Sequence, residues 1–154
     1  MPHKLNIVLL EPEIPANTGS IGRVCLATEC TLHLVEPLGF DINDKQLKRA
    51  GLDYWQHLQV QRHKSVETFF QSLPADAPRV FFSTKGKISH YEHSYQPGSY
   101  LIFGCETRGI SPEVLATYPG PVCKVPQYDD RIRSLNLSNV VSIIIYEAIR
   151  QLGP

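Results

Sequence analysis

Short apolar runs alternate with helix-like segments along the whole chain, and this alternation strongly limits the folds open to it. The apolar runs lie at residues 5–10, 31–35, 58–60, 79–83, 100–103 and 121–125. The helix-like segments lie at residues 17–29, 44–50, 65–73, 112–118 and 137–152. The first run is apolar at almost every position, which is typical of a strand buried on both faces of a parallel sheet. The alternation predicts an α/β fold, with a mostly parallel sheet flanked by helices.

The length fits one domain spanning residues 1–154 with a sizeable core. The chain carries 15 basic and 15 acidic side chains, so it lacks the overall positive charge of many nucleic-acid-binding proteins. Any RNA-binding surface is therefore expected to be a local patch. The longest apolar runs fall well short of the ~18 residues of a membrane span, and no secretory leader pattern is visible. We expect a cytoplasmic protein that does not enter membranes.

The four cysteines have no spacing typical of a metal site. Cys25, Cys30, Cys105 and Cys123 form no Cys-x-x-Cys pair, and no paired histidines follow them. We therefore expect no zinc and no other bound metal. Cys25 and Cys123 lie in apolar elements, which favours buried, reduced thiols. Cys105 differs because it lies inside a polar loop.

This polar loop follows the apolar run at residues 100–103 and reads Gly104-Cys-Glu-Thr-Arg-Gly109. The missing Cβ of Gly104 is expected to let a ligand approach the backbone closely. The loop matches neither the Gly-x-Gly-x-x-Gly of a dinucleotide site nor the Gly-Lys-Ser/Thr of a phosphate-binding loop. An ordinary strand-to-helix turn is the alternative, and this loop alone does not exclude it.

Two further polar segments open helices. Arg133-Ser-Leu-Asn-Leu-Ser-Asn139 places hydroxyls, amides and free N–H groups at the positive end of the last helix, although elaborate capping is an alternative interpretation. Near the N-terminus, residues 11–23 end in Asn17-Thr-Gly-Ser-Ile-Gly-Arg23. We expect Asn17 to cap a helix, with Arg23 almost two turns later. On its own, Arg23 is also consistent with a surface arginine.

Taken in order, these three segments and Val125-Pro126 resemble the SPOUT superfamily of RNA methyltransferases, over residues 5–152. Within it, the chain is most similar to the small bacterial enzymes that methylate the 2'-hydroxyl of cytidine or uridine at the tRNA wobble position, nucleotide 34. The resemblance implies a deep C-terminal trefoil knot, an exception to the rule that chains do not thread loops. It also implies S-adenosyl-L-methionine as the methyl donor, S-adenosylhomocysteine as the product, and no metal. One departure is Cys105, which stands where the family usually has proline.

The resemblance also assigns site residues. The cofactor-binding positions that it implies are Phe82, Gly104, Val125, Ser134, Leu135 and Asn139. The catalytic positions that it implies are Arg23, Asn17 and Glu106. A ribose hydroxyl gains negative charge as it attacks a methyl group, so a fixed guanidinium at Arg23 would stabilise it. Because guanidinium stays protonated, we expect Arg23 to act electrostatically, while an RNA phosphate or water takes the proton.

The implied substrate is the tRNA anticodon stem-loop, and scattered basic residues are the candidates for binding it. They are Lys45, Lys48, Arg49, Arg62, His63, Lys64, Lys85, Lys87, Arg131 and Arg133, with Tyr91 and Tyr128 as candidates for stacking on bases. An ordinary solvated surface is the alternative for each charge cluster. Two other functions remain open: methylation of another tRNA or ribosomal RNA nucleotide, and non-catalytic RNA binding on the same fold.

The last helix has the clearest pattern in the chain. Its apolar stripe consists of Leu137, Val140, Val141, Ile144, Ile145, Ala148, Ile149 and Leu152. Ile143 and Tyr146 lie off this stripe, so a second surface is needed to cover them. That surface is either another layer of the same domain or a second copy of the chain. The lack of an appended RNA-binding module favours a homodimer that contributes two surfaces.

Overall fold

The computed structural model describes residues 3–43, 45, 49 and 54–153. Within these residues, seven strands form one sheet in the order β3-β2-β1-β6-β4-β7-β5, and each neighbouring pair runs parallel. The strands are β1 (Asn6–Leu10), β2 (Thr31–Val35), β3 (Val60–His63), β4 (Arg79–Phe82), β5 (Ile88–Ser89), β6 (Tyr100–Phe103) and β7 (Val122–Lys124). The predicted α/β fold with a parallel sheet is confirmed.

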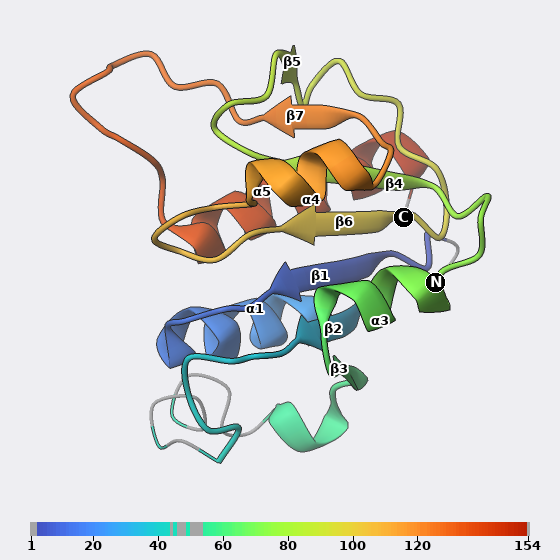
Figure 1. Ribbon diagram of the computed structural model, residues 1–154, viewed down its shortest axis with the longest axis vertical. Coiled ribbons are helices and arrows are strands. Elements are labelled where there is room, and N and C mark those ends of the chain that lie inside the picture. Colours follow the sequence, from blue (N-terminus) through green and yellow to red (C-terminus); the bar gives the residue numbers. More distant parts are fainter. Residues whose placement is uncertain (1–2, 44, 46–48, 50–53, 154) are drawn as a thin grey trace.

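Helices cover both faces of this sheet (Figure 1). They are α1 (Pro15–Ala27), α3 (Val66–Ser72), α4 (Pro112–Thr117) and α5 (Leu137–Leu152), and a short 3-10 helix, η1 (Trp55–His57), precedes β3. Side chains alternate along β1, so Ile7 and Leu9 join the core beneath α1 and α5. Val8 and Leu10 join the core beneath α3 and α4. Burial on both faces explains why the strands are continuous apolar runs.

Local signals set most element boundaries. The Ser65 and Ser111 hydroxyls accept hydrogen bonds from the first turns of α3 and α4, as N-caps should. The strand expected at 58–60 is instead β3, beginning at Val60, because Leu58 packs against the core as part of the preceding turn. The two-residue strand β5 was not predicted. Most of the helix expected at 44–50, including Lys48, lies outside the described residues.

The last helix buries its predicted stripe and leaves two large residues uncovered. Val141 and Ile144 are fully buried, whereas Ile143 and Tyr146 are 38% and 56% exposed. α5 packs beside α1 on the same face of the sheet. Within the described chain, no second layer covers Ile143 and Tyr146. Among the described helices, none is long and apolar enough to cross a membrane.

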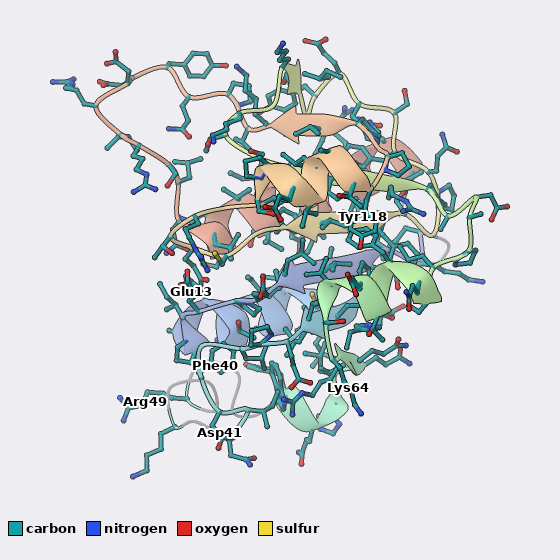
Figure 2. All side chains as sticks on the ribbon, in the orientation of Figure 1. Glu13, Phe40, Asp41, Arg49, Lys64 and Tyr118 are labelled. Carbon is teal, nitrogen blue, oxygen red and sulfur yellow. The ribbon has the colours of Figure 1, made fainter. Side chains whose placement is uncertain are left out.

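The carboxyl ends of the central strands lie together at one end of the sheet. Leu9 and Phe82 each pair with Phe103, and Phe82 also pairs with Cys123. Polar loops follow each of these strands, and Glu13, in the loop after β1, marks this end of the molecule in Figure 2. Ligands of open parallel sheets bind outside the carboxyl ends of the strands. The three motif loops of the sequence therefore lie where such a site is expected.

Candidate functional site

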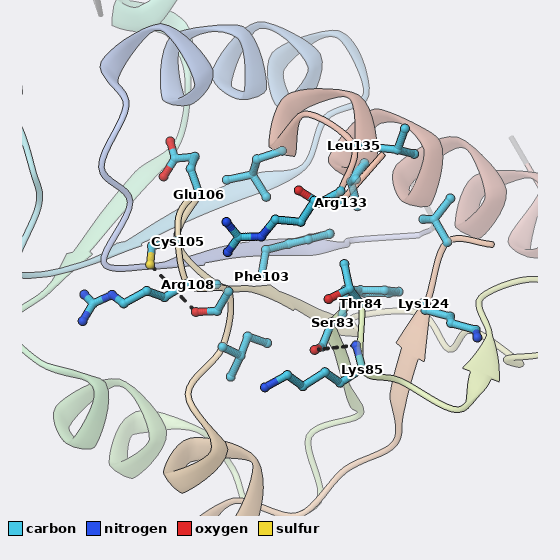
Figure 3. Close-up of a pocket in the computed structure, with 18 of the residues that line it drawn as sticks. Ser83, Thr84, Lys85, Phe103, Cys105, Glu106, Arg108, Lys124, Arg133 and Leu135 are labelled. Carbon is cyan, nitrogen blue, oxygen red and sulfur yellow. Dashed lines mark hydrogen bonds between the residues drawn. The ribbon is translucent and has the colours of Figure 1, made fainter. Parts of the chain in front are cut away.

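A cavity of about 300 Å³ opens at the carboxyl ends of β4, β6 and β7 (Figure 3). The rings of Phe82 and Phe103 line it and stack with their centroids 4.9 Å apart. Its other walls come from residues 83–85, 104–110, 124, 125, 127, 133–135, 137 and 140. An apolar surface beside backbone and short polar groups suits a small molecule that has a planar ring and a polar end.

Five of the six residues that were expected to bind the cofactor line this cavity. They are Phe82, Gly104, Val125, Ser134 and Leu135. The sixth, Asn139, is exposed on the first turn of α5 and is not among the described residues lining the cavity. The segment before α5 also provides the cap, since Asn136 Oδ1 accepts hydrogen bonds from the N–H and hydroxyl of Ser138, at 2.9 and 2.6 Å. Within this motif, Ser134 and Leu135 therefore line the cavity, whereas Asn136 caps the helix.

The absence of a Cβ at Gly104 makes room for the protein's own backbone, whereas the sequence led us to expect room for a ligand. A Cβ placed there would lie 2.1 Å from the carbonyl carbon of Gly109 and 2.2 Å from the nitrogen of Ile110. The loop turns back on itself, and Gly109 N–H donates to the Cys105 carbonyl at 2.9 Å. The space beside Gly104 is thus filled by the returning chain rather than left open for a ligand.

The prediction that Asn17 caps α1 is wrong. α1 begins at Pro15 with Ile14 at the N-cap position, and Ile14 makes no side-chain capping bond. Glu106, from the loop after β6, instead binds the two residues just before the helix: its two carboxylate oxygens accept from the N–H groups of Glu13 and Ile14, at 2.8 Å each. The Asn17 amide also donates to Glu106, at 3.3 Å. A carboxylate from a distant loop is favourable here because the start of a helix has free N–H groups and positive potential.

A second carboxylate makes the reverse connection, and the sequence pattern did not point to it. Glu13 Oε1 accepts from the Thr107 N–H at 3.1 Å and from the Thr107 hydroxyl at 2.7 Å. These hydrogen bonds lower the pKa of Glu13, the hydroxyl having the larger effect. Arg133 adds a third connection by donating to the Thr107 carbonyl at 2.8 Å. Three loops that are distant in the sequence therefore meet at Thr107.

Arg23 lies outside the cavity of its own chain. It is exposed on α1, and its guanidinium carbon lies 4.7 Å from the centre of the Tyr54 ring, a cation–π contact. It is not among the described residues lining the cavity. The structure brings Asn17 and Glu106 together but leaves Arg23 apart from the predicted cofactor residues.

Cations surround the cavity. Lys85, Arg108, Lys124 and Arg133 line it, and Glu106 is the one acidic residue among the described lining residues (Figure 3). The sequence had pointed to Lys85 and Arg133 but not to Arg108 or Lys124, which lie in loops or at a strand end without a charge run.

An adjoining depression is formed by residues 127–133 together with Thr84 and Lys124. Tyr128 is 94% exposed in this loop. Arg131 is bonded to Asp129, with 2.6 Å between Arg131 Nη2 and the carboxylate. Arg131 is therefore less available for a phosphate than the cations that line the cavity.

Other RNA-binding candidates lie elsewhere. Arg62 and His63 belong to β3 at the edge of the sheet, where Arg62 pairs with Glu36 at 3.4 Å. His63 stacks on the buried His33. Tyr91 is exposed but rests against His90, with 4.0 Å between ring centroids. The structure does not bring these residues to the cavity.

Known proteins match both the sequence and this geometry. The profile of the SpoU rRNA methylase family matches residues 4–146. The tRNA (cytidine(34)-2'-O)-methyltransferase of Escherichia coli K12 is 49% identical over 152 residues, covering 97% of this chain and 94% of that protein. A structure solved in work on the 2-OH methylation of C/U34 on tRNA has a TM-score of 0.94 at 45% identity, covering 99% of this chain and 98% of its own. The SpoU methyltransferase AviRb from Streptomyces viridochromogenes, solved with the cofactor AdoMet, shares the fold with a TM-score of 0.85 at 23% identity, over 99% of this chain and 62% of its own. With the family profile matching nearly its whole length, this chain belongs to the SpoU rRNA methylase family.

Proposed function

We propose that this protein transfers a methyl group from S-adenosylmethionine to the ribose 2'-hydroxyl of the wobble nucleotide of tRNA, cytidine or uridine 34, and releases S-adenosylhomocysteine. One observation carries the proposal. Two of the three motif segments, 104–109 and 133–139, supply walls of the cavity, together with Val125, in a chain that is 49% identical, over 97% of its length, to a tRNA (cytidine(34)-2'-O)-methyltransferase. The protein would work in the cytoplasm, as one domain over residues 1–154.

The residues of the cavity fit the cofactor. Phe82 and Val125 offer an apolar surface to a planar base, while Ser134 and the backbone around Gly104 offer polar groups to the rest of the molecule. When bound, S-adenosylmethionine supplies a methyl group, activated by its sulfonium, to an attacking oxygen. The AdoMet complex of a protein with this fold supports the assignment.

The roles of the catalytic candidates follow from their contacts. Both Glu106 oxygens are engaged by donors from the start of α1, so we assign Glu106 to positioning rather than to proton transfer, and Asn17 acts with it. Arg23 would stabilise negative charge on the ribose oxygen as it attacks. Because Arg23 lies outside the cavity of its own chain, the proposal requires a second copy to supply it, and the hydroxyl proton passes to a phosphate or water.

A homodimer meets this requirement and covers the exposed part of α5. Ile143 and Tyr146 are the large apolar residues that α5 leaves uncovered, and α5 packs beside α1, which carries Arg23. A two-fold interface uses the same patch on both copies. Burying Ile143 and Tyr146 in this way would therefore bring the α1 region of each copy close to the interface.

The anticodon stem-loop would lie over the cationic rim. Lys85, Arg108, Lys124 and Arg133 are placed to contact phosphates, which position an RNA without reading its sequence. Tyr128 offers an exposed ring on which a base of the loop can stack. We also propose the trefoil knot: residues 125–136 run from β7 past the cavity to α5, which packs beside α1, and this path is in keeping with one.

Methylation of tRNA from cells that lack wobble methylation tests the proposal. Purified protein and S-adenosylmethionine should place one methyl group on the ribose of nucleotide 34, located by nuclease digestion and mass spectrometry. Lys124→Ala should weaken tRNA binding and reduce its salt dependence. The matched control is Lys4→Ala, an exposed lysine just before β1, at the opposite end of the strands from the cavity. A methyl group only at another nucleotide would refute the wobble assignment. Cofactor binding without methylation of any RNA would refute the activity.

A further inference from the structure

We infer that Glu13 is a positioning residue for the cofactor-binding wall, acting mainly through Thr107. This inference rests on the proposed function, because that function makes the wall a cofactor site; the position of Thr107 itself can be tested without cofactor. Glu13 is not among the described residues that line the cavity, whereas Thr107 is. Glu13 therefore acts on a bound molecule only through lining residues of the turn at 104–109, and its strongest side-chain contact with that turn is Thr107. We call the contacts of Glu13 and Arg133 with Thr107 the Thr107 junction.

The junction fixes Thr107 through all of its backbone hydrogen-bonding groups. The N–H and the hydroxyl of Thr107 donate to one oxygen of Glu13, and its carbonyl accepts from Arg133. Thr107 lies at the tip of the turn closed by the bond between Gly109 N–H and the Cys105 carbonyl. The tip of such a turn has no neighbours in the sheet, so its position depends on these contacts.

Glu13 can fix Thr107 because its own backbone is fixed on two sides. Its N–H donates to Glu106, from the same turn as Thr107. On the other side, Gly39 packs so closely that a Cβ there would lie 2.8 Å from the Cα of Glu13, and Gly39 N–H donates to the Pro12 carbonyl at 2.9 Å. The carboxylates of Glu13 and Glu106 thus bind each other's loops reciprocally.

The reciprocal bonds connect the cavity wall to the start of α1. If the tip of the turn moves, the N–H groups of Glu13 and Ile14 lose their bonds to Glu106. Thr107 loses its bonds to Glu13 at the same time. Cofactor binding against this turn would therefore stabilise the start of α1, the helix that carries Arg23. Pre-organisation of this kind affects affinity because the cost of ordering the loop is removed before binding.

The test compares Glu13→Ala with Glu13→Gln. Alanine removes the acceptor, whereas the glutamine amide oxygen can accept both bonds from Thr107. We expect Glu13→Ala to raise the dissociation constant of S-adenosylmethionine by about tenfold, the order of an intramolecular hydrogen bond lost, and Glu13→Gln to stay within about threefold of the original chain. Calorimetric titration measures both. Glu67→Ala, which removes a carboxylate from the first turn of α3 on the opposite face, is the matched control.

Amide hydrogen exchange of the free protein provides a readout that needs no cofactor. Exchange at residues 106–109 should be faster in Glu13→Ala and near normal in Glu13→Gln, with residues 66–72 unchanged in both. Failure of the proposed function would appear differently, as cofactor binding without tRNA methylation in the original chain. Unchanged exchange and affinity in folded Glu13→Ala would overturn the inference. Equal losses in the alanine and glutamine variants would also overturn it, because acceptor geometry would then not be the cause.

Discussion

Gly104→Ala is the substitution whose outcome follows most directly from the geometry. The added methyl group would lie 2.1, 2.2 and 2.5 Å from three backbone atoms of Gly109 and Ile110. A side chain in that position could rotate away, but backbone atoms inside a closed turn cannot. The two arms of the turn must therefore separate by about 1 Å or more, against the packing of a close-packed interior.

Overpacking of this kind costs typically about 1–3 kcal/mol, and a backbone collision belongs at the upper end or above it. We therefore expect Gly104→Ala to cost about 3 kcal/mol. For a chain of this length, that corresponds to a fall in melting temperature of roughly 6–12 °C. The displaced turn forms part of the cavity wall, so cofactor affinity should fall with it.

Two other glycines separate steric from conformational effects. Gly109 has φ +66° and Gly98 has φ +77°, and an added Cβ meets nothing within 4 Å at either position. Alanine at each should cost about 1 kcal/mol, the strain of a left-handed backbone. Thermal unfolding followed by circular dichroism ranks the three variants, and calorimetry measures cofactor affinity. If Gly104→Ala melted within about 2 °C of the original chain, the proposed collision would be refuted.

Four further outcomes are expected. Arg23→Ala should lower the single-turnover methylation rate by about 10²-fold or more while cofactor affinity is kept. Arg23→Lys should restore little of this rate, because lysine lacks the planar guanidinium. A near-normal rate in Arg23→Ala would show that Arg23 takes no part in the reaction. In filter-binding measurements, Tyr128→Ala should weaken tRNA binding by about tenfold through lost stacking, whereas Tyr128→Phe should keep the original affinity. An equal loss of affinity in both variants would exclude stacking. Tyr146→Glu should convert a dimer into a less active monomer in sedimentation, whereas a stable, active monomer of the original chain would contradict the homodimer. Burial, and secondarily the nearby His63, lowers the pKa of His33 to about 4, so the unfolded chain binds more protons between pH 6.5 and 4. Acidification through this range should lower stability by roughly 3 kcal/mol, and His33→Gln should flatten the dependence in unfolding measured at several pH values.

Periodicity and capping residues predicted most of the fold because they act locally. The continuous apolar run at β1 indicated a strand buried on both faces, and Ser65 and Asn136 cap the helices that follow them. Local signals of this kind could not predict the order of the strands in the sheet. β6 lies between β1 and β4 although about 90 residues separate it from β1, and only tertiary packing decides that neighbour. β5 is too short to carry a pattern.

In the candidate site, too, local motifs predicted some residues, whereas contacts between distant loops were not predicted. Residues such as Ser134 and Leu135 lie in the motif that pointed to them and line the cavity. Asn17 was predicted to be the N-cap because its residue type favours that role, yet α1 begins earlier, and Glu106 from a distant loop binds the N–H groups that precede the helix. Glu13 carries no local signal, since its partner Thr107 is 94 positions away. Contacts between loops depend on the folded sheet and cannot be predicted from the spacing in either loop.

The same contacts explain how the chain forms this turn with Cys105, at the position where the family resemblance leads one to expect proline. A proline at position 105 would restrict φ locally. Here the shape of the turn is set by other means: Gly104 permits the close return of Gly109, and Gly109 N–H donates to the Cys105 carbonyl. Glu106 then attaches the turn to the start of α1. Cys105 itself is buried, with its thiol 3.8 Å from the Gly109 carbonyl. Because non-local bonds determine the position of this wall, the restriction that proline would supply is not needed to form the cavity.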